Sequence, residues 1–343
     1  MSRPSVDLSR LIELVESFPR QKIAVLADLV ADEFVSGEIS RVSREAPVLI
    51  LRHRETQLVP GGGANAANNL TDLGARVMPV GVLGDDAAGR ALLDYFRSKQ
   101  VDTRGILILK GWHTSTKTRF MAGWTHTARQ QVLRVDRETG NALTASVTRR
   151  LERAARAAAS RADALLVSDY GCGAVSPALV RKLRARLVTL DSRYSMLDYA
   201  GCGLTAATPN EPELEAIYGT RVGTNVGRLE SLGARLLRRL RLKALLVTRG
   251  KDGMAVFEPR HKPVHIPVHG SDQVADVTGA GDTVIAAFTL ALAAGATFVE
   301  AAQLANYAGG IVVMKRGTAT VSRNELLEAI TDDLTGRAAP QSK

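Results

Sequence analysis

Cysteine and aromatic residues are scarce in this sequence, and their scarcity excludes two classes of protein. The two cysteines, Cys172 and Cys202, are too few for a disulfide framework and lack the paired C-x-x-C spacing of metal sites. Aromatic residues make up 4% of the chain, too few for the stacking platform that binds single-stranded nucleic acid. We therefore expect two free thiols in a reducing compartment and a cytoplasmic protein.

Long apolar runs are absent as well. The most apolar stretch, Val284 to Val299, is interrupted by Gly295 and follows Asp282 directly. It is shorter than the ~18 to 20 residues that cross a membrane. The stretch from Val6 to Val15 has helical spacing but lacks the unbroken apolar centre of an export signal. The sequence predicts one buried helix over 284–299 and no membrane partner.

Positive charge is plentiful. The chain has 45 Lys and Arg against 35 Asp and Glu, a formal net charge of +10, which suggests an acidic partner. Many of the arginines fall in helical runs with Ala and Leu, where their stems cover apolar neighbours on solvated helix faces. We therefore expect an anionic small molecule as the partner, and no nucleic acid.

Short apolar runs alternate with longer stretches rich in Ala, Leu and Arg. This alternation is typical of βαβ units and predicts an α/β fold with a mostly parallel central sheet. The runs are apolar on both faces, as strands are when helices cover both sides of the sheet. The predicted strands are Ile23–Ala27, Val77–Leu83, Ala164–Ser168, Leu187–Leu190, Ala244–Thr248 and Met254–Phe257.

Two segments, at about 34–58 and 114–138, break the alternation with Thr, Val, Ile and Arg in strand-like order. We expect them to form a small β lid outside the main sheet. An exposed β lid favours a homodimer, because an uncovered strand edge tends to pair with a second copy. Residues 1–21 are expected to form a helical extension, and the polar residues 333–343 a flexible tail.

The strongest local motif is Asp276-Val-Thr-Gly-Ala-Gly-Asp282, directly before the apolar run. A turn made by Gly279, Ala280 and Gly281 would leave free backbone N–H groups at the positive end of a helix dipole, which forms an anion hole. Asp282 would lie in the first turn of that helix, ionised and facing a substrate hydroxyl. The alternative is a tight turn with Asp282 as a helix cap.

Two further motifs suggest ligand contacts. In the stretch from Pro60 to Asn69, three consecutive glycines would let the backbone approach a polyhydroxylated ligand, and Asn65 offers a donor and an acceptor to sugar hydroxyls. The alternative is a flexible loop before an ordinary helix. The stretch from Thr208 to Glu213 places an amide and a carboxylate after a strand, suited to Mg²⁺ through waters. A proline-started helix with an acidic first turn explains it equally well.

Familiar nucleotide and zinc motifs are missing. Residues 111–118 come close to a Walker A loop but have Thr116 where a glycine must precede the lysine, and no G-x-G-x-x-G follows a strand. ATP, if used, must be held in another way. His261, His265 and His269 are interrupted by prolines, so we predict a surface strand there and no zinc site.

Taken together, these residues resemble the PfkB (ribokinase-like) carbohydrate kinase family. Its two signatures are similar to Gly61–Gly89 and Asp276–Asp282, and the resemblance runs from about Lys22 to about Ile330. It implies a ribokinase-like three-layer sandwich over residues 22–332 that carries the β lid. It also implies ATP as co-substrate and Mg²⁺ as cofactor, with K⁺ as a further candidate.

Within the family, the sequence is similar to the kinases that convert D-glycero-D-manno-heptose 7-phosphate to the 1,7-bisphosphate, a precursor of ADP-heptose and the lipopolysaccharide core. The similarity lies in residues 40–47, 116–119, 134–136, 168–170 and 208–210. The sequence departs from that pattern at Ala27, where a glycine is expected, and at Cys172 and Arg193, where lysines are expected. The H-x-G-H nucleotidylyltransferase motif is missing, so we expect only a kinase half.

The resemblance implies a role for each matching residue. Asp282 would be the catalytic base, and the amides of Gly279, Ala280 and Gly281 would hold the transferring phosphoryl group. The sugar would contact Asp28, Asp32, Gly62, Gly63, Asn65 and Asp169. The nucleotide would contact Asn210, Glu211, Pro212, Glu213, Thr248, Arg249, Gly250, Asn306 and Gly309, with Glu213 binding Mg²⁺ through water. We add Lys117, Arg119 and Arg134 on the lid as candidates for the phosphate of the sugar, because a dianion calls for Arg or Lys.

Two other functions remain open. The chain could be a kinase of the same family that acts on a neutral sugar or a nucleoside. It could also be a protein of this fold without catalysis that binds a sugar or a nucleic acid.

Overall fold

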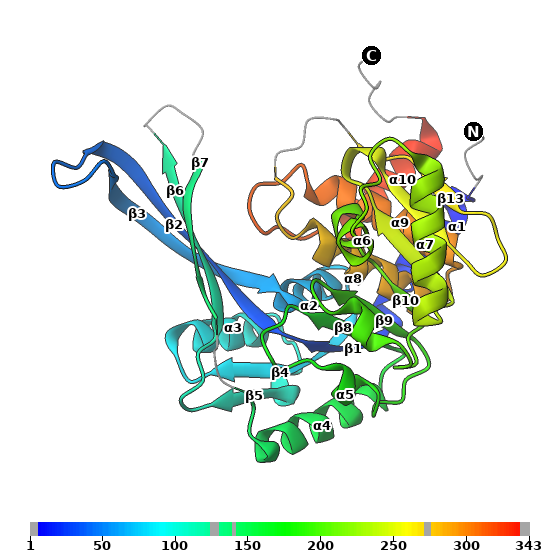
Figure 1. The fold of residues 1–343 in the computed structure, drawn as a ribbon, viewed down its shortest axis with the longest axis horizontal. Helices are drawn as coiled ribbons and strands as arrows, with labels where there is room; N and C mark the ends of the chain where they lie inside the picture. The colour runs from blue at the N-terminus through cyan, green and yellow to red at the C-terminus, as the bar shows by residue number, and fades with distance from the viewer. Residues whose placement is uncertain (1–5, 124–129, 139–141, 271–275, 337–343) are drawn as a thin grey trace.

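A computed structural model describes residues 6–123, 130–138, 142–270 and 276–336. Parts of three predicted segments lie outside the described residues: 1–5 of the helical extension, 124–129 of the second lid segment and 337–343 of the tail. The chain folds into a body with a long β lid that projects from it (Figure 1).

The centre of the body is a mostly parallel sheet, which confirms the predicted α/β class. Among the described residues, nine strands pair in the order β13-β12-β11-β10-β9-β8-β1-β4-β5, and β12 alone runs antiparallel to its neighbours, β11 and β13. The strand order reverses beside β1, where ligands bind in open sheets of this kind. The strands are β1 (Lys22–Ala27), β4 (Arg76–Gly84), β5 (Ile106–Leu109), β8 (Ala164–Asp169), β9 (Val188–Ser192), β10 (Ala206–Ala207), β11 (Ala244–Thr248), β12 (Met254–Phe257) and β13 (Val264–Ile266).

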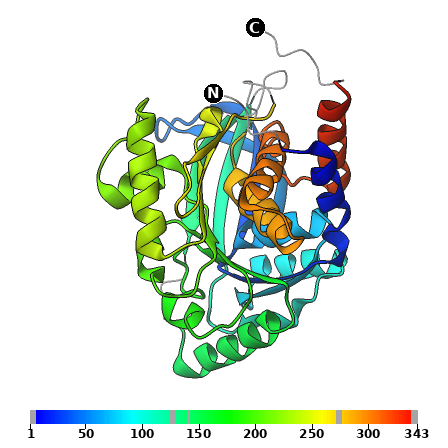
Figure 2. The same cartoon turned by 90° about the vertical axis from the view of Figure 1, so that its right-hand side faces the viewer.

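Helices cover both faces of the sheet, which gives the predicted three layers (Figure 2). Each face has its own buried apolar cluster, as expected for strands that are apolar on both sides. One face carries α1 (Leu8–Glu16), α2 (Gly63–Asp72), α3 (Ala87–Ser98), α8 (Ala280–Ala293), α9 (Phe298–Val312) and α10 (Arg323–Thr335). The other carries α4 (Ala145–Ala159), α5 (Pro177–Val180), α6 (Glu211–Tyr218) and α7 (Val226–Leu240).

The lid is a second, four-stranded sheet in the order β3-β2-β6-β7. Its strands are β2 (Leu29–Val42), β3 (Leu49–Gly62), β6 (Ser115–Gly123) and β7 (Gln130–Arg137). Strands β2 and β3 extend beyond the lid segment predicted at 34–58. Only Asp28 separates β1 from β2, and β3 continues to the start of α2. The base of the lid is therefore part of the body.

Three local predictions differ from the structure. The single helix predicted over 284–299 is wrong, because the apolar run divides between α8 and α9. Gly295, at a φ of 93°, breaks it. The histidine segment forms a strand only at Val264–Ile266, and Ile266 is buried. Helix α10 continues to Thr335, three residues into the predicted tail.

No helix among the described residues combines the length and the apolar character needed to cross a membrane.

Candidate active site at the carboxyl edge of the sheet

Four carboxylates that are far apart in the sequence gather near the carboxyl ends of adjacent strands. Asp28 follows β1, Asp169 ends β8, and Asp191 lies near the end of β9. Asp282 reaches the same region from the first turn of α8, and it is close enough to Asp191 for its charge to raise the pKa of that carboxyl. The carboxyl edge of an open parallel sheet is where such folds bind ligands, so we treat this cluster as the candidate site.

Asp282 is 3% exposed, and each of its oxygens accepts one hydrogen bond. The Tyr170 phenol donates to Oδ1 at 2.7 Å, and the Asn65 amide donates to Oδ2 at 3.0 Å. Burial raises the pKa of Asp282 to about 6, while these hydrogen bonds and the nearby Lys117 act in the opposite direction. The carboxylate is ionised at neutral pH and can still accept a proton. Because Gly279 is the N-cap of α8, the alternative in which Asp282 caps the helix does not apply.

The Gly-Ala-Gly turn before Asp282 has the geometry of an anion site. Gly279 adopts a φ of 78°, and a Cβ there would lie 2.6 Å from the Asn65 amide nitrogen, so glycine is required. The Ala280 N–H donates to the Val277 carbonyl at 3.2 Å. Within the described part of the chain, the N–H groups of Gly281 and Asp282 have no acceptor. They lie at the N-terminus of a 14-residue helix, which suits an anion.

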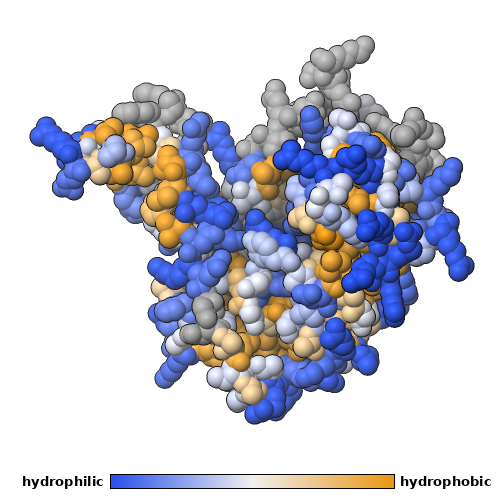
Figure 3. All heavy atoms as spheres, viewed as in Figure 1, coloured by the Kyte–Doolittle hydropathy of each residue, from blue (hydrophilic) through white to orange (hydrophobic). Residues whose placement is uncertain are grey.

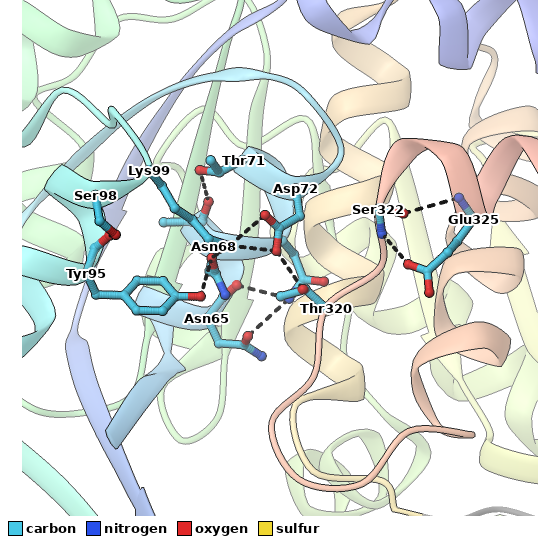
Figure 4. A network of polar contacts seen from close by, with 12 residues as sticks. Asn65, Asn68, Thr71, Asp72, Tyr95, Ser98, Lys99, Thr320, Ser322 and Glu325 are labelled. Carbon is cyan, nitrogen blue, oxygen red and sulfur yellow. Dashed lines mark hydrogen bonds and ion pairs between the residues drawn. The ribbon is translucent and has the colours of Figure 1, made fainter. Parts of the chain in front are cut away.

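Helix α2 presents Asn65 to Asp282 and is held in place by partly buried hydrogen bonds. Asn68 and Asp72, on the same helix, accept hydrogen bonds from Lys99 Nζ at 2.8 Å and 2.6 Å. The Thr320 hydroxyl, from the segment before α10, donates to Asp72 at 2.6 Å (Figure 4). The predicted small-residue helix is therefore held by Lys99 on one side and by Thr320 on the other. The alternative of a flexible loop before this helix does not apply, because Gly61 and Gly62 belong to strand β3.

Two glycines at this junction leave room for the site loop after β8. Gly62 has a φ of 49°, and a Cβ there would lie 3.3 Å from the Tyr170 ring. At Gly63 a Cβ would lie 2.4 Å from the Cβ of Ala27. The glycines thus permit close packing of α2 against β1 and the loop.

Asp28 and Asp169 hold that loop, and this differs from the sugar contacts predicted for them. The Asp28 carboxylate accepts backbone N–H groups of the 170–175 segment at 2.9 to 3.3 Å, namely those of Tyr170, Cys172, Ala174 and Val175. The Asp169 carboxylate accepts the Gly171 N–H and the hydroxyls of Ser192, Ser195 and Tyr199. Burial raises the pKa of Asp28 to about 6. Each oxygen of Asp28 accepts two of these bonds, whereas Asp169 Oδ1 accepts one and Asp169 Oδ2 accepts three.

Asp32 and Arg119 form a buried ion pair at the base of the lid. Their nearest atoms are 2.9 Å apart, and their side chains are 5% and 10% exposed. Asp32 also accepts the Thr318 hydroxyl at 2.7 Å, and the Arg119 guanidinium lies 5.4 Å from the Phe34 ring centroid. In the structure, the Arg119 guanidinium is paired with Asp32, whereas the sequence predicted that it would be available to bind the phosphate of the sugar.

Lys117 and Arg134 face an open pocket between the lid and the site loop. Lys117 Nζ lies 4.9 Å from the Tyr170 ring centroid, whereas Arg134 forms an ion pair with Asp136 at 2.8 Å. Arg193, stacked on Tyr194 at 5.5 Å, lines the same pocket. Among the residues that line the pocket are Lys117, Arg134, Tyr170, Cys172, Arg193 and Tyr194.

The predicted nucleotide segment forms a capped helix start. Asn210 and Glu213 make a capping box, in which each side chain accepts the backbone N–H of the other at 2.8 and 2.9 Å. Pro212 lies in the first turn, so the helix-start alternative is correct as a description of local structure. Burial raises the pKa of Glu213. Asp191 is half-buried, and its pKa is raised well above its ordinary value by desolvation and by the charge of Glu213.

Of the remaining residues predicted to bind the nucleotide, Thr248 and Arg249 contact the start of this helix, and Asn306 and Gly309 lie on α9. Arg249 pairs with Glu211 at 2.8 Å, and Thr248 bridges to Asn210. Gly250, which follows them, has a φ of 54°. For Asn306 and Gly309, which are predicted to flank the adenine, the Asn306 amide donates to the Pro267 carbonyl at 2.9 Å, and Gly309 packs on Val284.

Sequence reasoning missed two residues of the site. Tyr170 lies in the 168–170 stretch that resembles the heptose-phosphate kinases but was given no role, and Asp191 was not predicted. The position of Asp191 near the end of a predicted strand could have identified it. No local signal could have paired Tyr170 with Asp282, because they are 112 residues apart.

Comparisons with known proteins match this chain to one family. The family model described as pfkB family carbohydrate kinase matches residues 29–325. Bifunctional protein HldE of Desulfatibacillum aliphaticivorans is 38% identical over 324 residues, which cover 93% of this chain and 65% of that protein. Bifunctional protein HldE of Geobacter metallireducens is 40% identical over 310 residues, which cover 88% of this chain and 61% of that protein. The chain thus spans less than two thirds of the length of these curated relatives.

Solved structures share the fold at low sequence identity. Phosphofructokinase-2 from Escherichia coli, in complex with substrates and products, aligns with a TM-score of 0.71 at 18% identity and covers 91% of this chain and 98% of its own. Arabidopsis thaliana ribokinase, complexed with ribose and ATP, aligns with a TM-score of 0.67 at 19% identity and covers 90% and 98%. Both confirm the predicted ribokinase-like architecture.

Proposed function

The chain belongs to the pfkB family of carbohydrate kinases, and from this premise we propose that its acceptor is a phosphosugar. It is an ATP-dependent sugar kinase. We take D-glycero-D-manno-heptose 7-phosphate as the substrate and the 1,7-bisphosphate as the product, a step toward ADP-heptose and the lipopolysaccharide core. The shared motifs and the similarity to the HldE proteins support this substrate. The observation that carries the chemistry is the buried Asp282 carboxylate beside the backbone N–H groups of Gly281 and Asp282, which are unpaired within the described residues.

In the proposed reaction, Asp282 accepts the proton of the acceptor hydroxyl while that oxygen bonds to the γ-phosphorus of ATP. The bond between the γ-phosphorus and the β–γ bridging oxygen breaks, and ADP leaves with that electron pair. The backbone N–H groups of Gly281 and Asp282, at the N-terminus of α8, stabilise the negative charge on the transferring group, whereas the Ala280 N–H of the predicted anion hole is already paired with the Val277 carbonyl. Positioning and electrostatics provide most of the catalysis.

Glu213, together with Asp191, would hold Mg²⁺ through water molecules. The pair fits this ion, because two carboxylates whose charges repel at close range favour a bound divalent cation. Nowhere in the described segments do three acidic, His or Cys side chains form a metal cage, so waters and phosphate oxygens would complete the shell. When bound, Mg²⁺ neutralises charge on the β- and γ-phosphates. We assign no residue to K⁺.

For the nucleotide, we propose contacts with the Asn210–Glu213 segment and with the Thr248–Gly250 turn, which pair with each other. Asn306 and Gly309 would support the nucleotide side indirectly, through the 267 carbonyl and the packing of α9 on α8.

We propose that Lys117 and Arg193 hold the existing phosphate of the sugar. Both line the open pocket in front of Tyr170, and their recorded contacts are with aromatic rings rather than with carboxylates. Arg119 and Arg134 are each paired with an aspartate. Arg193 occupies the position where the heptose-phosphate kinases are expected to carry a lysine, and it keeps the positive charge there.

One observation favours a second candidate, a kinase of a neutral sugar or a nucleoside. Asp32 and Asp136 already neutralise two of the three cations predicted for the phosphate, and Cys172 replaces an expected lysine. A pocket with less net positive charge would accept an uncharged sugar more readily.

The test is ATP turnover with Mg²⁺ across a panel of acceptors, with the phosphorylated product identified. We expect selective turnover of D-glycero-D-manno-heptose 7-phosphate over fructose phosphates, fructose, ribose and nucleosides. Asp282→Asn should abolish turnover and leave sugar binding, measured by calorimetry, largely intact. Full activity of Asp282→Asn would contradict the mechanism. Turnover of a neutral acceptor would contradict the phosphosugar, and no turnover with tight, salt-dependent nucleic acid binding would favour a protein without catalysis.

We further propose a cytoplasmic homodimer with one kinase domain over residues 22–332. Both cysteines are free thiols, which suits a reducing compartment. The lid exposes a set of large apolar side chains that a second copy would cover: Val42, Val48, Leu49, Val132, Leu133 and Val135. An apolar area is visible toward the outer end of the lid (Figure 3), as expected for an interaction surface.

A further inference from the structure

We propose that Tyr170 is a positioning residue that fixes the direction of the Asp282 carboxylate through a hydrogen bond from its phenol. The phenol donates to Asp282 Oδ1 at 2.7 Å, and Asn65 donates to Oδ2 from the other side at 3.0 Å. A carboxylate oxygen has two acceptor sites, so one site on each oxygen stays available to a substrate hydroxyl. This inference rests on the proposed role of Asp282 as the base.

The backbone of Tyr170 is held by the Asp28 carboxylate. Its N–H donates to Asp28 Oδ2 at 2.9 Å, and the next residues of the loop donate to the same carboxylate. On the other side of the loop, Asp169 accepts the Gly171 N–H at 2.9 Å. Two buried carboxylates therefore fix the loop that carries the phenol, which gives them a use other than sugar binding.

The ring of Tyr170 is held from two sides. Lys117 Nζ lies 4.9 Å from its centroid, a distance at which an ammonium is attracted to an aromatic face. On another side, Gly62 comes so close that a Cβ would lie 3.3 Å from two ring carbons. The ring has little freedom to turn, so its hydroxyl has one direction, toward Asp282.

Tyr170 acts only as a donor. Desolvation and the charge of Asp282 raise its pKa well above the ordinary value, so the phenol keeps its proton. A hydrogen bond to the charged form of a carboxylate lowers its pKa, and the Tyr170 bond acts in this direction on Asp282. Of the charged groups that face Asp282, Lys117 acts in the same direction, whereas Asp32 and Asp191 oppose it.

The experiment replaces Tyr170 with Phe, which keeps the ring and removes the donor. The pKa of Asp282 is read from the carboxyl ¹³C resonance in protein labelled at aspartate, with Asp282→Asn used to assign the signal. We expect an upward shift of about one pH unit, the size of a charge-assisted hydrogen bond. The acid limb of kcat/KM should move upward by the same amount, since the base must be ionised.

Tyr199→Phe is the matched control. Tyr199 is also buried and also donates to an aspartate behind the same loop, Asp169, at 2.8 Å. We expect this variant to lower the thermal midpoint and to leave the Asp282 pKa unchanged. A role for Tyr170 in stability alone would make the two variants alike, and an unchanged Asp282 pKa in a folded Tyr170→Phe protein would overturn the inference.

The two readouts separate this inference from the proposed function. If the carboxyl resonance of Asp282 shifts in Tyr170→Phe and the acid limb of kcat/KM does not, the hydrogen bond acts as inferred and Asp282 is not the base. If neither the Asp282 pKa nor the acid limb of kcat/KM shifts in Tyr170→Phe while Asp282→Asn is inactive, Asp282 is the base and the inferred role of Tyr170 is wrong. The resonance needs no turnover, so it gives a result even with an acceptor that the enzyme does not phosphorylate.

Discussion

Lys117 and Arg119 lie two residues apart on β6, on the same face of the lid, and their surroundings differ. Arg119 is paired with Asp32 and almost fully buried, whereas Lys117 reaches the open pocket and lies over the Tyr170 ring. Two cations that look alike in sequence therefore have different uses, one in the structure of the lid and the other in the proposed phosphate contact.

We expect Arg119→Met and Lys117→Met to fail in different ways. Arg119→Met leaves Asp32 buried without its partner, which should cost about 3 to 5 kcal/mol in the free energy of unfolding. Lys117→Met should leave stability near that of the wild type and raise KM for the phosphosugar roughly tenfold, the value of one charge-assisted contact. Denaturant unfolding and steady-state kinetics measure the two effects. If Arg119→Met is as stable as the wild type and has a raised KM, Arg119 binds the phosphate of the sugar and is not a structural residue of the lid.

Part of the site could be predicted from single residues, and part could not. Asp282 and its glycine turn are local in sequence, because a turn and the first turn of a helix share a few consecutive residues. The partners of Arg119 and Tyr170 depend on contacts between segments that are distant in the sequence. The uses of Asp28 and Asp169 depend on the path of a loop, and a sequence pattern does not specify such a path.

Helix α2 depends on a glycine at its first residue. A Cβ at Gly63 would lie 2.4 Å from Ala27 Cβ and 2.8 Å from the Asp28 carbonyl oxygen, so backbone would have to move. We expect Gly63→Ala to lower the free energy of unfolding by about 1 to 3 kcal/mol, the usual cost of overpacking, and to displace Asn65.

Gly227 in α7 provides the control. A Cβ there meets only the Asn225 side chain, at 3.5 Å, and alanine favours a helix over glycine. Gly227→Ala should therefore be neutral or stabilising in the same unfolding experiment. Equal stability of the two alanine variants would show that the close approach at Gly63 relaxes at no cost.

The elements that sequence patterns identified are those with an unambiguous period or a long apolar run. The strands β1, β4, β8, β9, β11 and β12 were predicted within a few residues of their ends. The strands β5 and β10, of four and two residues, were missed because such short runs carry little pattern, whereas β13 lies in the histidine segment for which a strand was predicted. The division of the apolar run into α8 and α9 was missed because one glycine within a helical pattern does not always end a helix.

At the scale of the molecule, the lid is the part that a second copy would complete. We expect Leu133→Asp, at a side chain 55% exposed on β7, to convert a dimer to a monomer in light scattering. Leu334→Asp should leave the oligomeric state unchanged, because this residue is comparably exposed, at 47%, on α10 away from the lid. A wild-type protein that is monomeric at all concentrations would contradict the proposed homodimer.

The fold class followed from the alternation of apolar runs because the whole chain repeats it. The lid followed from the interruption of that alternation. The way in which the lid is attached to the body could not be predicted from the sequence. The continuity of β1 with β2 and of β3 with α2 depends on hydrogen bonding that the composition of the segments does not reveal.

Asp28 is the one residue between β1 and β2, and this short junction limits how the lid can evolve. Adding one residue there would move each later side chain of β2 to the opposite face of the lid, and would take Asp32 and Phe34 away from Arg119. The hairpin between Val42 and Leu49 is far from these contacts and can gain or lose residues without that effect. Descendants of this enzyme that bind larger or smaller acceptors would therefore be expected to differ in the length of the hairpin and to keep the junction unchanged.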